Sequence, residues 1–184
     1  MSKQRVSFAD DDKYSIRALA LMRMPALLVG LLLGFVLSFM TSVFEELLTT
    51  NVQTVFFLPF IVYMADAVGT QSQTIYVRDL GRGKAKFLTY LLKETALGII
   101  LGSVFGVISF VVVSLWLGSA ELAIAVAIAV LAAIGTAPVV AIIVTEVLEL
   151  EHKDPALGAG PIATVIQDAI SVLVFGAVAS AFLL

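Results

Sequence analysis

The stretch from Phe87 to Leu117, FLTYLLKETALGIILGSVFGVISFVVVSLWL, decides what kind of fold this chain adopts. Its only charged residues are Lys93 and Glu94, and both lie near its start. A helix needs about 20 mainly apolar residues to cross the hydrocarbon core of a bilayer, and this stretch is longer than that. It therefore predicts a helix that spans a membrane.

Four further stretches have the same character. They are Pro25 to Phe44, Val55 to Tyr76, Glu121 to Val147 and Pro161 to Leu184. The whole chain of 184 residues is 60% hydrophobic and only 14% charged, with a mean hydropathy of +1.07, well outside the balance of a soluble domain. We therefore expect an all-α integral membrane protein with five transmembrane helices in a lipid bilayer. No soluble module is predicted that could read a nucleic acid, so a nucleic-acid partner is not expected.

The basic residues predict the orientation of the five spans. All eleven fall on one side: Lys3, Arg5, Lys13, Arg17 and Arg23 before the first span, Arg78, Arg82, Lys84, Lys86 and Lys93 around the second connection, and Lys153 in the fourth. Positive charge is retained on the cytoplasmic side of membrane proteins. The N-terminus should therefore be cytoplasmic and the C-terminus outside, in a multi-pass protein of the cell membrane, the plasma membrane of a prokaryote.

Four prolines are expected to shape the spans. Pro25 and Pro161 stand where a span opens, and a first turn has no partner for the missing N–H. Pro59 and Pro138 fall inside spans, where proline kinks or interrupts a helix. Interrupted helices at membrane depth are tolerated mainly where they line a cavity.

An aspartate near the C-terminus is the first candidate for a functional residue. Asp168 lies in GPIATVIQDAIS, residues 160–171, and no basic residue of this segment can neutralise it. An acid at bilayer depth costs at least about 2.5–3.5 kcal/mol and usually faces a polar cavity or an ion path. Gly160, Thr164, Asp168 and Ser171 are three or four residues apart and share one helix face. The alternative is a protonated acid, or one hydrogen-bonded to a neighbouring helix.

The second span carries the other polar cluster, DAVGTQSQT, residues 66–74. Asp66 should lie close to the bilayer midplane, and Gly69 allows close approach of the backbone. Thr70 and Gln71 supply neutral oxygens, which suit a hydrated hard cation such as Mg²⁺. The alternative is a polar contact between helices at the cytoplasmic end.

Glu94 and two glycine repeats allow two interpretations each. Glu94 either forms a pair with Lys93 or Arg82 or takes part in a cytoplasmic pore mouth. The glycines of Gly98-x-x-x-Gly102-x-x-x-Gly106 and Gly30-x-x-x-Gly34 permit close helix contact, either within one protomer or between two.

Three sequence blocks carry a family resemblance. Asp154-Pro155-Ala156-Leu157, followed by Pro161, Thr164 and Asp168, resembles the stretch between the last two helices of the MgtE family of magnesium channels and transporters. The block from Gly69 to Thr74, ending in Arg78, looks like its polar pore helix, and Leu92-Lys93-Glu94 with Gly98 and Gly102 is similar to its third-helix entry.

The resemblance implies an MgtE-like transmembrane fold and a homodimer. Its central pore would be formed by the second and fifth helices of both copies, with hydrated Mg²⁺, the transported ion, bound by paired Asp168 side chains. Asp66 and Thr164 are the further candidate ligands, and the candidate pore-lining residues are Gly69, Thr70, Gln71, Gly160 and Ser171. We thus divide the chain into a cytosolic segment, residues 1–23, either an interfacial helix or a tail, and an ion-transport domain, residues 24–184.

The chain also departs from the family pattern. Gly160 stands where the family usually has asparagine, and Asp66 and Ala67 stand in a segment that is often rich in asparagine and glycine. We expect the transmembrane domain alone, without the cytosolic N domain and paired CBS domains that gate many relatives. Gating would then rest on acidic residues of the chain, such as Asp10 to Asp12, or on a separate cytosolic regulatory protein.

Three other functions are kept open. A carrier or exporter of Mg²⁺ coupled to Na⁺ or H⁺ is the nearest, because carboxylates within a span can carry protons. An intramembrane aspartyl protease would use Asp66 and Asp168 together to activate water. The third is a membrane scaffold without bound ions. The leading expectation is a transport protein and not an enzyme.

Overall fold

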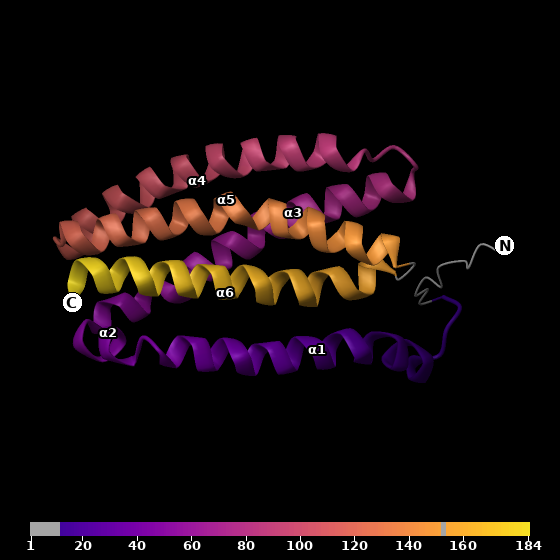
Figure 1. Ribbon diagram of the computed structural model, residues 1–184, viewed down its shortest axis with the longest axis horizontal. Coiled ribbons are helices and arrows are strands. Elements are labelled where there is room, and N and C mark those ends of the chain that lie inside the picture. The colour runs from indigo at the N-terminus through magenta and orange to yellow at the C-terminus, as the bar shows by residue number, and fades with distance from the viewer. Residues whose placement is uncertain (1–11, 152–153) are drawn as a thin grey trace.

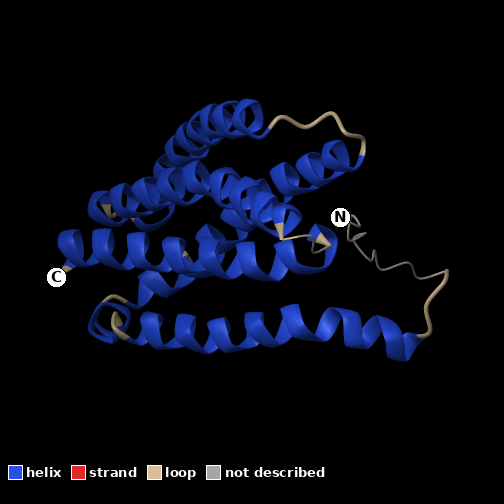
Figure 2. Cartoon of the chain, turned by 45° about the vertical axis from the view of Figure 1, so that its right-hand side comes forward, coloured by secondary structure: helices blue, strands red, loops and turns tan. Residues whose placement is uncertain are grey.

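Five long helices lie side by side, and two short ones join the first long helix to the second (Figures 1 and 2). This computed structural model describes residues 12–151 and 154–184. The elements are α1 (Ile16–Ser42), α2 (Glu45–Thr50), the 3-10 helix η1 (Val52–Phe56), α3 (Leu58–Gly81), α4 (Phe87–Leu117), α5 (Ala120–Leu150) and α6 (Pro155–Leu183). Within the described ranges, five helices are long and apolar enough to cross a membrane. The prediction of an all-α fold with five spans is confirmed.

Successive long helices run in opposite directions. In Figure 1 the start of α1, the connection from α3 to α4, the end of α5 and the start of α6 lie at the right-hand end. The short helix α2, the connection from α4 to α5 and the C-terminus lie at the opposite end. Arg17, Arg23, Arg78 and Arg82 therefore lie toward one end of the bundle. The cytoplasmic location of that end stays a prediction.

Helix α5 forms the centre of the bundle. It packs against α3, α4 and α6. Its buried positions include the alanines Ala125, Ala129, Ala133 and Ala137, whose small side chains let the three neighbours approach closely. Ser119 begins the helix, since its hydroxyl accepts a hydrogen bond from the Leu122 N–H at 3.2 Å.

A stripe of glycines brings α4 directly onto the backbone of α5. An ideal Cβ added to Gly98, Gly102 or Gly106 would lie 2.8, 2.7 and 3.0 Å from the carbonyl oxygens of Gly135, Leu131 and Ala127. Real Cβ atoms essentially never come closer than 3.0 Å to such atoms. Of the two interpretations of this repeat, packing within one protomer is therefore the one that the structure shows.

Helix α1 stands apart from the others. It packs on α6 and has no fully buried residue, and an added Cβ at Gly30 would meet Pro161 at 3.4 Å. Pro25 and Pro161 were expected to open spans, but each lies inside a longer helix, α1 or α6. Both helices continue past the apolar stretch at this end, which periodicity of hydrophobic residues alone does not reveal. Residues 16–23 therefore form the first part of α1.

The other two prolines differ from each other. Pro59 is the second residue of α3 and follows the break between η1 and α3, which interrupts the apolar span Val52–Gly81 as expected. There its missing N–H costs nothing. Pro138 lies inside α5, as expected, and its side chain borders Gly98 of α4.

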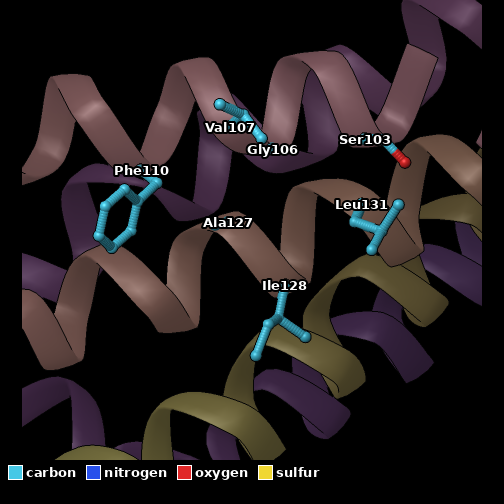
Figure 3. Close-up of a pocket in the computed structure, with 7 residues that line it drawn as sticks. All are labelled: Ser103, Gly106, Val107, Phe110, Ala127, Ile128 and Leu131. Atoms are coloured by element: carbon cyan, nitrogen blue, oxygen red, sulfur yellow. The ribbon is translucent and has the colours of Figure 1, made fainter. Parts of the chain in front are cut away.

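A shallow hollow of about 330 Å³ opens between α4 and α5 (Figure 3). Val107, Phe110 and Leu131 are among its lining residues, and Ser103 contributes the only side-chain polar atom of the lining. No carboxylate lines this hollow, so it is not a candidate ion site.

Candidate functional site

The candidate site lies where α3 crosses α6, two helices far apart in the sequence. The Thr164 hydroxyl on α6 donates a hydrogen bond of 2.8 Å to the Asp66 carboxylate on α3. Both residues are half-buried. The two candidate ligands that sequence reasoning placed on different spans are therefore brought into direct contact.

Asp168 lies one turn beyond Thr164 on the same helix. It is half-buried, and its Oδ1 atom is shielded from solvent and has no hydrogen-bond partner among the described residues. The ion pairs of α3 are made by Asp79, which binds Arg78 at 3.0 Å and Arg82 at 3.7 Å, and not by Asp66. Among the described residues, the site thus presents carboxylate oxygen without a basic side chain to neutralise it.

Gly69 and Gln167 meet at the same crossing. Gln167 is only 3% exposed, and its side-chain Nε2 donates to the Ala137 carbonyl of α5 at 3.3 Å. An added Cβ at Gly69 would lie 2.5 Å from both polar atoms of that amide. The absence of a side chain at Gly69 is what lets Gln167 pass between α3 and α6.

Sequence reasoning missed Gln167. In the sequence, its neighbour Asp168 stands out because it is a charged residue within an apolar span, and Gln167 does not. A recognisable pattern was present, because Gln167 is three residues after Thr164 and four before Ser171 and so belongs to a polar stripe of its own. The Ser171 hydroxyl, 0% exposed, donates to the Gln167 carbonyl at 2.8 Å.

The structure places the remaining candidate residues in three different environments. Thr70 and Gln71 lie on the exposed side of α3. Gly160 borders α3, since an added Cβ would lie 3.9 Å from the Gln73 amide nitrogen. Ser171 is buried in the protomer, as is Gly69. The structure therefore joins Asp66 and Thr164 directly and places Gly160 beside Gln73 of α3, whereas Thr70 and Gln71 face outward.

Glu94 has a partner that neither interpretation of the sequence named. It accepts a hydrogen bond of 2.6 Å from the Ser72 hydroxyl of α3. One turn along α3, the Tyr76 hydroxyl donates to Glu146 of α5 at 2.5 Å. Hydroxyl groups of α3 thus bind carboxylates of both α4 and α5.

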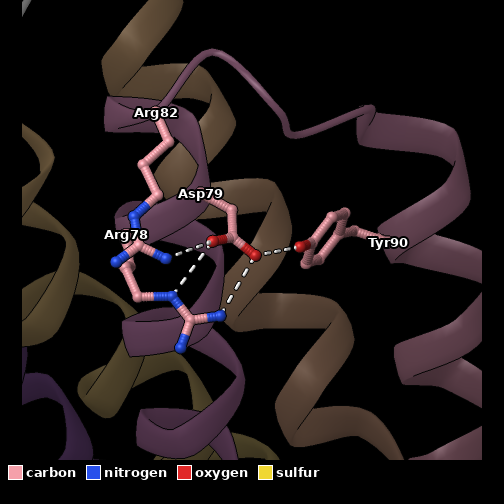
Figure 4. Close-up of polar contacts among 4 residues, drawn as sticks. All are labelled: Arg78, Asp79, Arg82 and Tyr90. Carbon is pink, nitrogen blue, oxygen red and sulfur yellow. Dashed lines mark hydrogen bonds and ion pairs between the residues drawn. The ribbon is translucent and has the colours of Figure 1, made fainter.

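A third polar contact closes this end of the bundle (Figure 4). The Tyr90 hydroxyl of α4 donates to Asp79, whose carboxylate also receives the Arg78 side chain. The Tyr90 and Tyr76 rings lie 5.0 Å apart. These contacts hold the C-terminal half of α3 against α4 and α5.

The described residues of one copy do not supply a complete cage of protein ligands. Within residues 12–151 and 154–184, no group of three or more histidine, cysteine or acidic side chains is placed to hold a metal ion. Mg²⁺ does not need such a cage, because it keeps several of its waters and is usually bound through one or two carboxylates.

Five helices long and apolar enough to cross a membrane, with carboxylates inside two of them, define a multi-pass membrane protein. The family model of MgtE, described as a divalent cation transporter, matches residues 58–178. The chain belongs to this family. The predicted resemblance and the MgtE transmembrane fold are thereby confirmed, and the family is one of transporters and not of enzymes.

Two curated relatives are both called magnesium transporter MgtE. The protein of Bacillus subtilis (strain 168) is 29% identical over 164 residues, and that of Enterococcus faecalis (strain ATCC 700802 / V583) is 30% identical over the same length. Each match covers 88% of this chain and 36% of the relative. The chain therefore spans little more than a third of these relatives. Bacterial relatives fit the predicted prokaryotic plasma membrane.

Some predictions fall on residues that the structure does not describe. Residues 1–11 hold most of the expected cytosolic segment, including Asp10 and Asp11, and residues 152–153 hold the last basic residue, Lys153. The domain boundary after residue 23 and a regulatory role of the N-terminal acids stay predictions.

Proposed function

We propose that this chain moves Mg²⁺ across the membrane as a homodimer, through a pore between the two copies lined by α3 and α6. The observation that carries the proposal is the Asp66–Thr164 contact with Asp168 one turn away, inside two helices that could cross a membrane and without a basic partner among the described residues. A carboxylate in such a place requires a cation or a proton.

The paired Asp168 side chains supply the charge that matches a divalent ion. A two-fold axis brings the same residue from both copies to one place, so two carboxylates face the ion. Their oxygens accept hydrogen bonds from the retained water shell, because Mg²⁺ dehydrates reluctantly. Asp168 Oδ1, which lacks a donor in the described chain, is suited to accept one of those bonds.

The surface of α3 supports the second copy. Thr70, Gln71 and Thr74 are exposed on this helix, although α3 is long and apolar enough to cross the membrane. Polar side chains at membrane depth face protein or a water-filled cavity rather than lipid. A second copy, with the pore between the two, would cover them.

The basic residues bear on the orientation, and the second acid of the site bears on the coupling. The basic end of the bundle, with Arg78 and Arg82, would be cytoplasmic, which leaves the C-terminus outside. A second candidate function is a carrier that couples Mg²⁺ to Na⁺ or H⁺, and the observation in its favour is the second acid, Asp66, at the α3–α6 crossing. An imposed Na⁺ or pH gradient that drives net Mg²⁺ movement would identify the carrier.

Mg²⁺ flux into proteoliposomes tests the transport site. The expected result is that Asp168→Asn abolishes Mg²⁺ flux. The control is Glu121→Gln, which should retain the flux because Glu121 is exposed near the connection between α4 and α5 and is not part of the site. Flux of Asp168→Asn equal to that of the unaltered chain would refute the role of Asp168.

Cysteine cross-linking tests the dimer, and it is simple because the chain contains no cysteine. Thr70→Cys on the proposed pore face should form a covalent dimer in membranes on oxidation. Leu115→Cys, 83% exposed on α4, is the matched control and should remain monomeric on gels. Equal cross-linking at both positions would argue against α3 as the dimer face.

A further inference from the structure

We infer that Gln167 is a positioning residue that sets the ion selectivity of the Asp168 site, an inference that rests on the function proposed above. Its amide passes between α3 and α6, over Gly69, and binds the backbone of α5. Gln167 thereby ties the helix that carries Asp168 to the central helix of the bundle.

Gln167 and Asp168 are neighbours in α6, so the directions of their side chains are linked. Consecutive residues of a helix point about 100° apart, so Gln167 and Asp168 cannot face the same neighbour. Gln167 points inward, to Ala137, and is 3% exposed, whereas Asp168 is half-buried. A bond that fixes the direction of Gln167 therefore also fixes the direction in which Asp168 leaves the helix.

Two hydrogen bonds made by residues just before Asp168 join α6 to two neighbouring helices. Thr164 joins α6 to Asp66 of α3 at 2.8 Å, and Gln167 joins α6 to α5 at 3.3 Å. Two bonds to two different helices prevent both rotation and sliding of α6. A hydrated ion is recognised through the distance between carboxylates and its water shell, so small rotations of α6 change which ion fits best.

Gly69 of α3 lies directly against the Gln167 amide. An added Cβ there would lie 2.5 Å from Nε2 and Oε1 and 2.8 Å from Cδ of Gln167, and its three nearest neighbours are all atoms of this one amide. A methyl group at position 69 would therefore displace the end of a flexible side chain and not a helix backbone. This makes Gly69→Ala a specific way to break the Gln167 bond while leaving residue 167 unchanged.

The polar atoms of Gln167 are not fully satisfied. Oε1 is buried and has no hydrogen-bond partner among the described residues. An apolar side chain of the same length would fill the space without that unpaired acceptor. The presence of an amide here is thus better explained by its bond to Ala137 than by packing.

The test compares transport selectivity in proteoliposomes made from the full chain. Gln167→Met keeps the length of the side chain and removes the donor. We expect the half-saturating Mg²⁺ concentration to rise about 2- to 10-fold, the range that one uncharged hydrogen bond is worth, and the preference for Mg²⁺ over Ca²⁺ to fall by a similar factor. A residue with a merely structural role would lower the maximal rate and leave both of these quantities unchanged.

A double-mutant cycle provides the second, independent variant. Gly69→Ala should reproduce the loss of selectivity in the unaltered chain, and should have no further effect in a Gln167→Ala background, where the clash is removed. Gly34→Ala, with nothing within 4 Å of its added Cβ, is the control and should transport normally. This cycle decides the matter if Gln167→Met does not yield folded protein.

Two results would overturn the inference. One is an unchanged half-saturating concentration and an unchanged Mg²⁺ to Ca²⁺ ratio in Gln167→Met. The other is a Gly69→Ala effect of equal size with and without Gln167. Asp168→Asn, measured in parallel, distinguishes failure of this inference from failure of the proposed function. If Asp168→Asn abolishes Mg²⁺ flux while Gln167→Met has no effect, only the role of Gln167 is refuted. If Asp168→Asn leaves the flux intact, the proposed site itself is refuted.

Discussion

Replacement of Gly102 by alanine should loosen the bundle where α4 lies directly on the backbone of α5. The added methyl carbon would lie 2.7 Å from the Leu131 carbonyl oxygen, about 0.7 Å short of the 3.4 Å at which ordinary contact begins. The nearest atom belongs to the backbone of α5, so no side-chain rotation can relieve the clash. Helices α4 and α5 must separate locally instead.

The magnitude follows from this separation. Overpacking of a tight contact costs about 1–3 kcal/mol, and a gap of about 0.5–1 Å also forfeits a quarter to a half of the dispersion attraction between facing atoms. Gly135→Ala is the matched control, because it lies on the facing helix and its added Cβ meets nothing within 4 Å. Both variants gain the same helix propensity from alanine, about 1 kcal/mol in water. The difference between their free energies of unfolding therefore reports the clash alone.

Thermal unfolding of the purified protein in detergent, followed by loss of helical circular dichroism, measures this difference. A change of 1 kcal/mol shifts the Tm of a chain of this size by about 2–4 °C, so Gly102→Ala should melt at least about 2 °C below Gly135→Ala. Equal Tm values for the two variants would refute the account of the α4–α5 contact.

Two further substitutions probe the hydrogen bonds of α3. Thr164→Val removes the donor to Asp66 and should destabilise the protein by about 1–3 kcal/mol, since hydrogen bonds to charged groups are stronger than average; an unchanged Tm without Mg²⁺ would contradict this. Tyr76→Phe leaves Glu146 without its donor and should lower the Tm in the same way, with Tyr63→Phe, an exposed tyrosine of the same helix, as the silent control. Equal Tm values for these two tyrosine variants would show that the Glu146 contact adds no stability.

The spans could be predicted from the sequence because length and hydropathy alone decide whether a helix crosses a bilayer. The polar contact between Asp66 and Thr164 was predictable only in part. Each residue stood out as polar within an apolar span, but no pattern in one chain says which faces of two distant helices meet.

Other features depend on packing that the sequence does not display. The Gly98 repeat fits a contact within a protomer as well as one between protomers, and only the backbone of α5 beside it decides the matter. Gln167 was missed for the same reason, because its importance arises from Gly69 on another helix. Pro25 was misplaced because a proline inside a membrane helix is tolerated when neighbouring groups satisfy the freed carbonyl.

The position of the bound ion tests the central claim most directly. A structure of the protein in lipid at high Mg²⁺ concentration should show a dimer with one ion on its two-fold axis, between the Asp168 carboxylates of the two copies. Mg²⁺ with its waters retained places the carboxylate oxygens about 4–5 Å from the ion, because a water at 2.0–2.1 Å lies between them. A dimer whose Asp168 side chains face away from the axis, or an ion held elsewhere, would contradict the account.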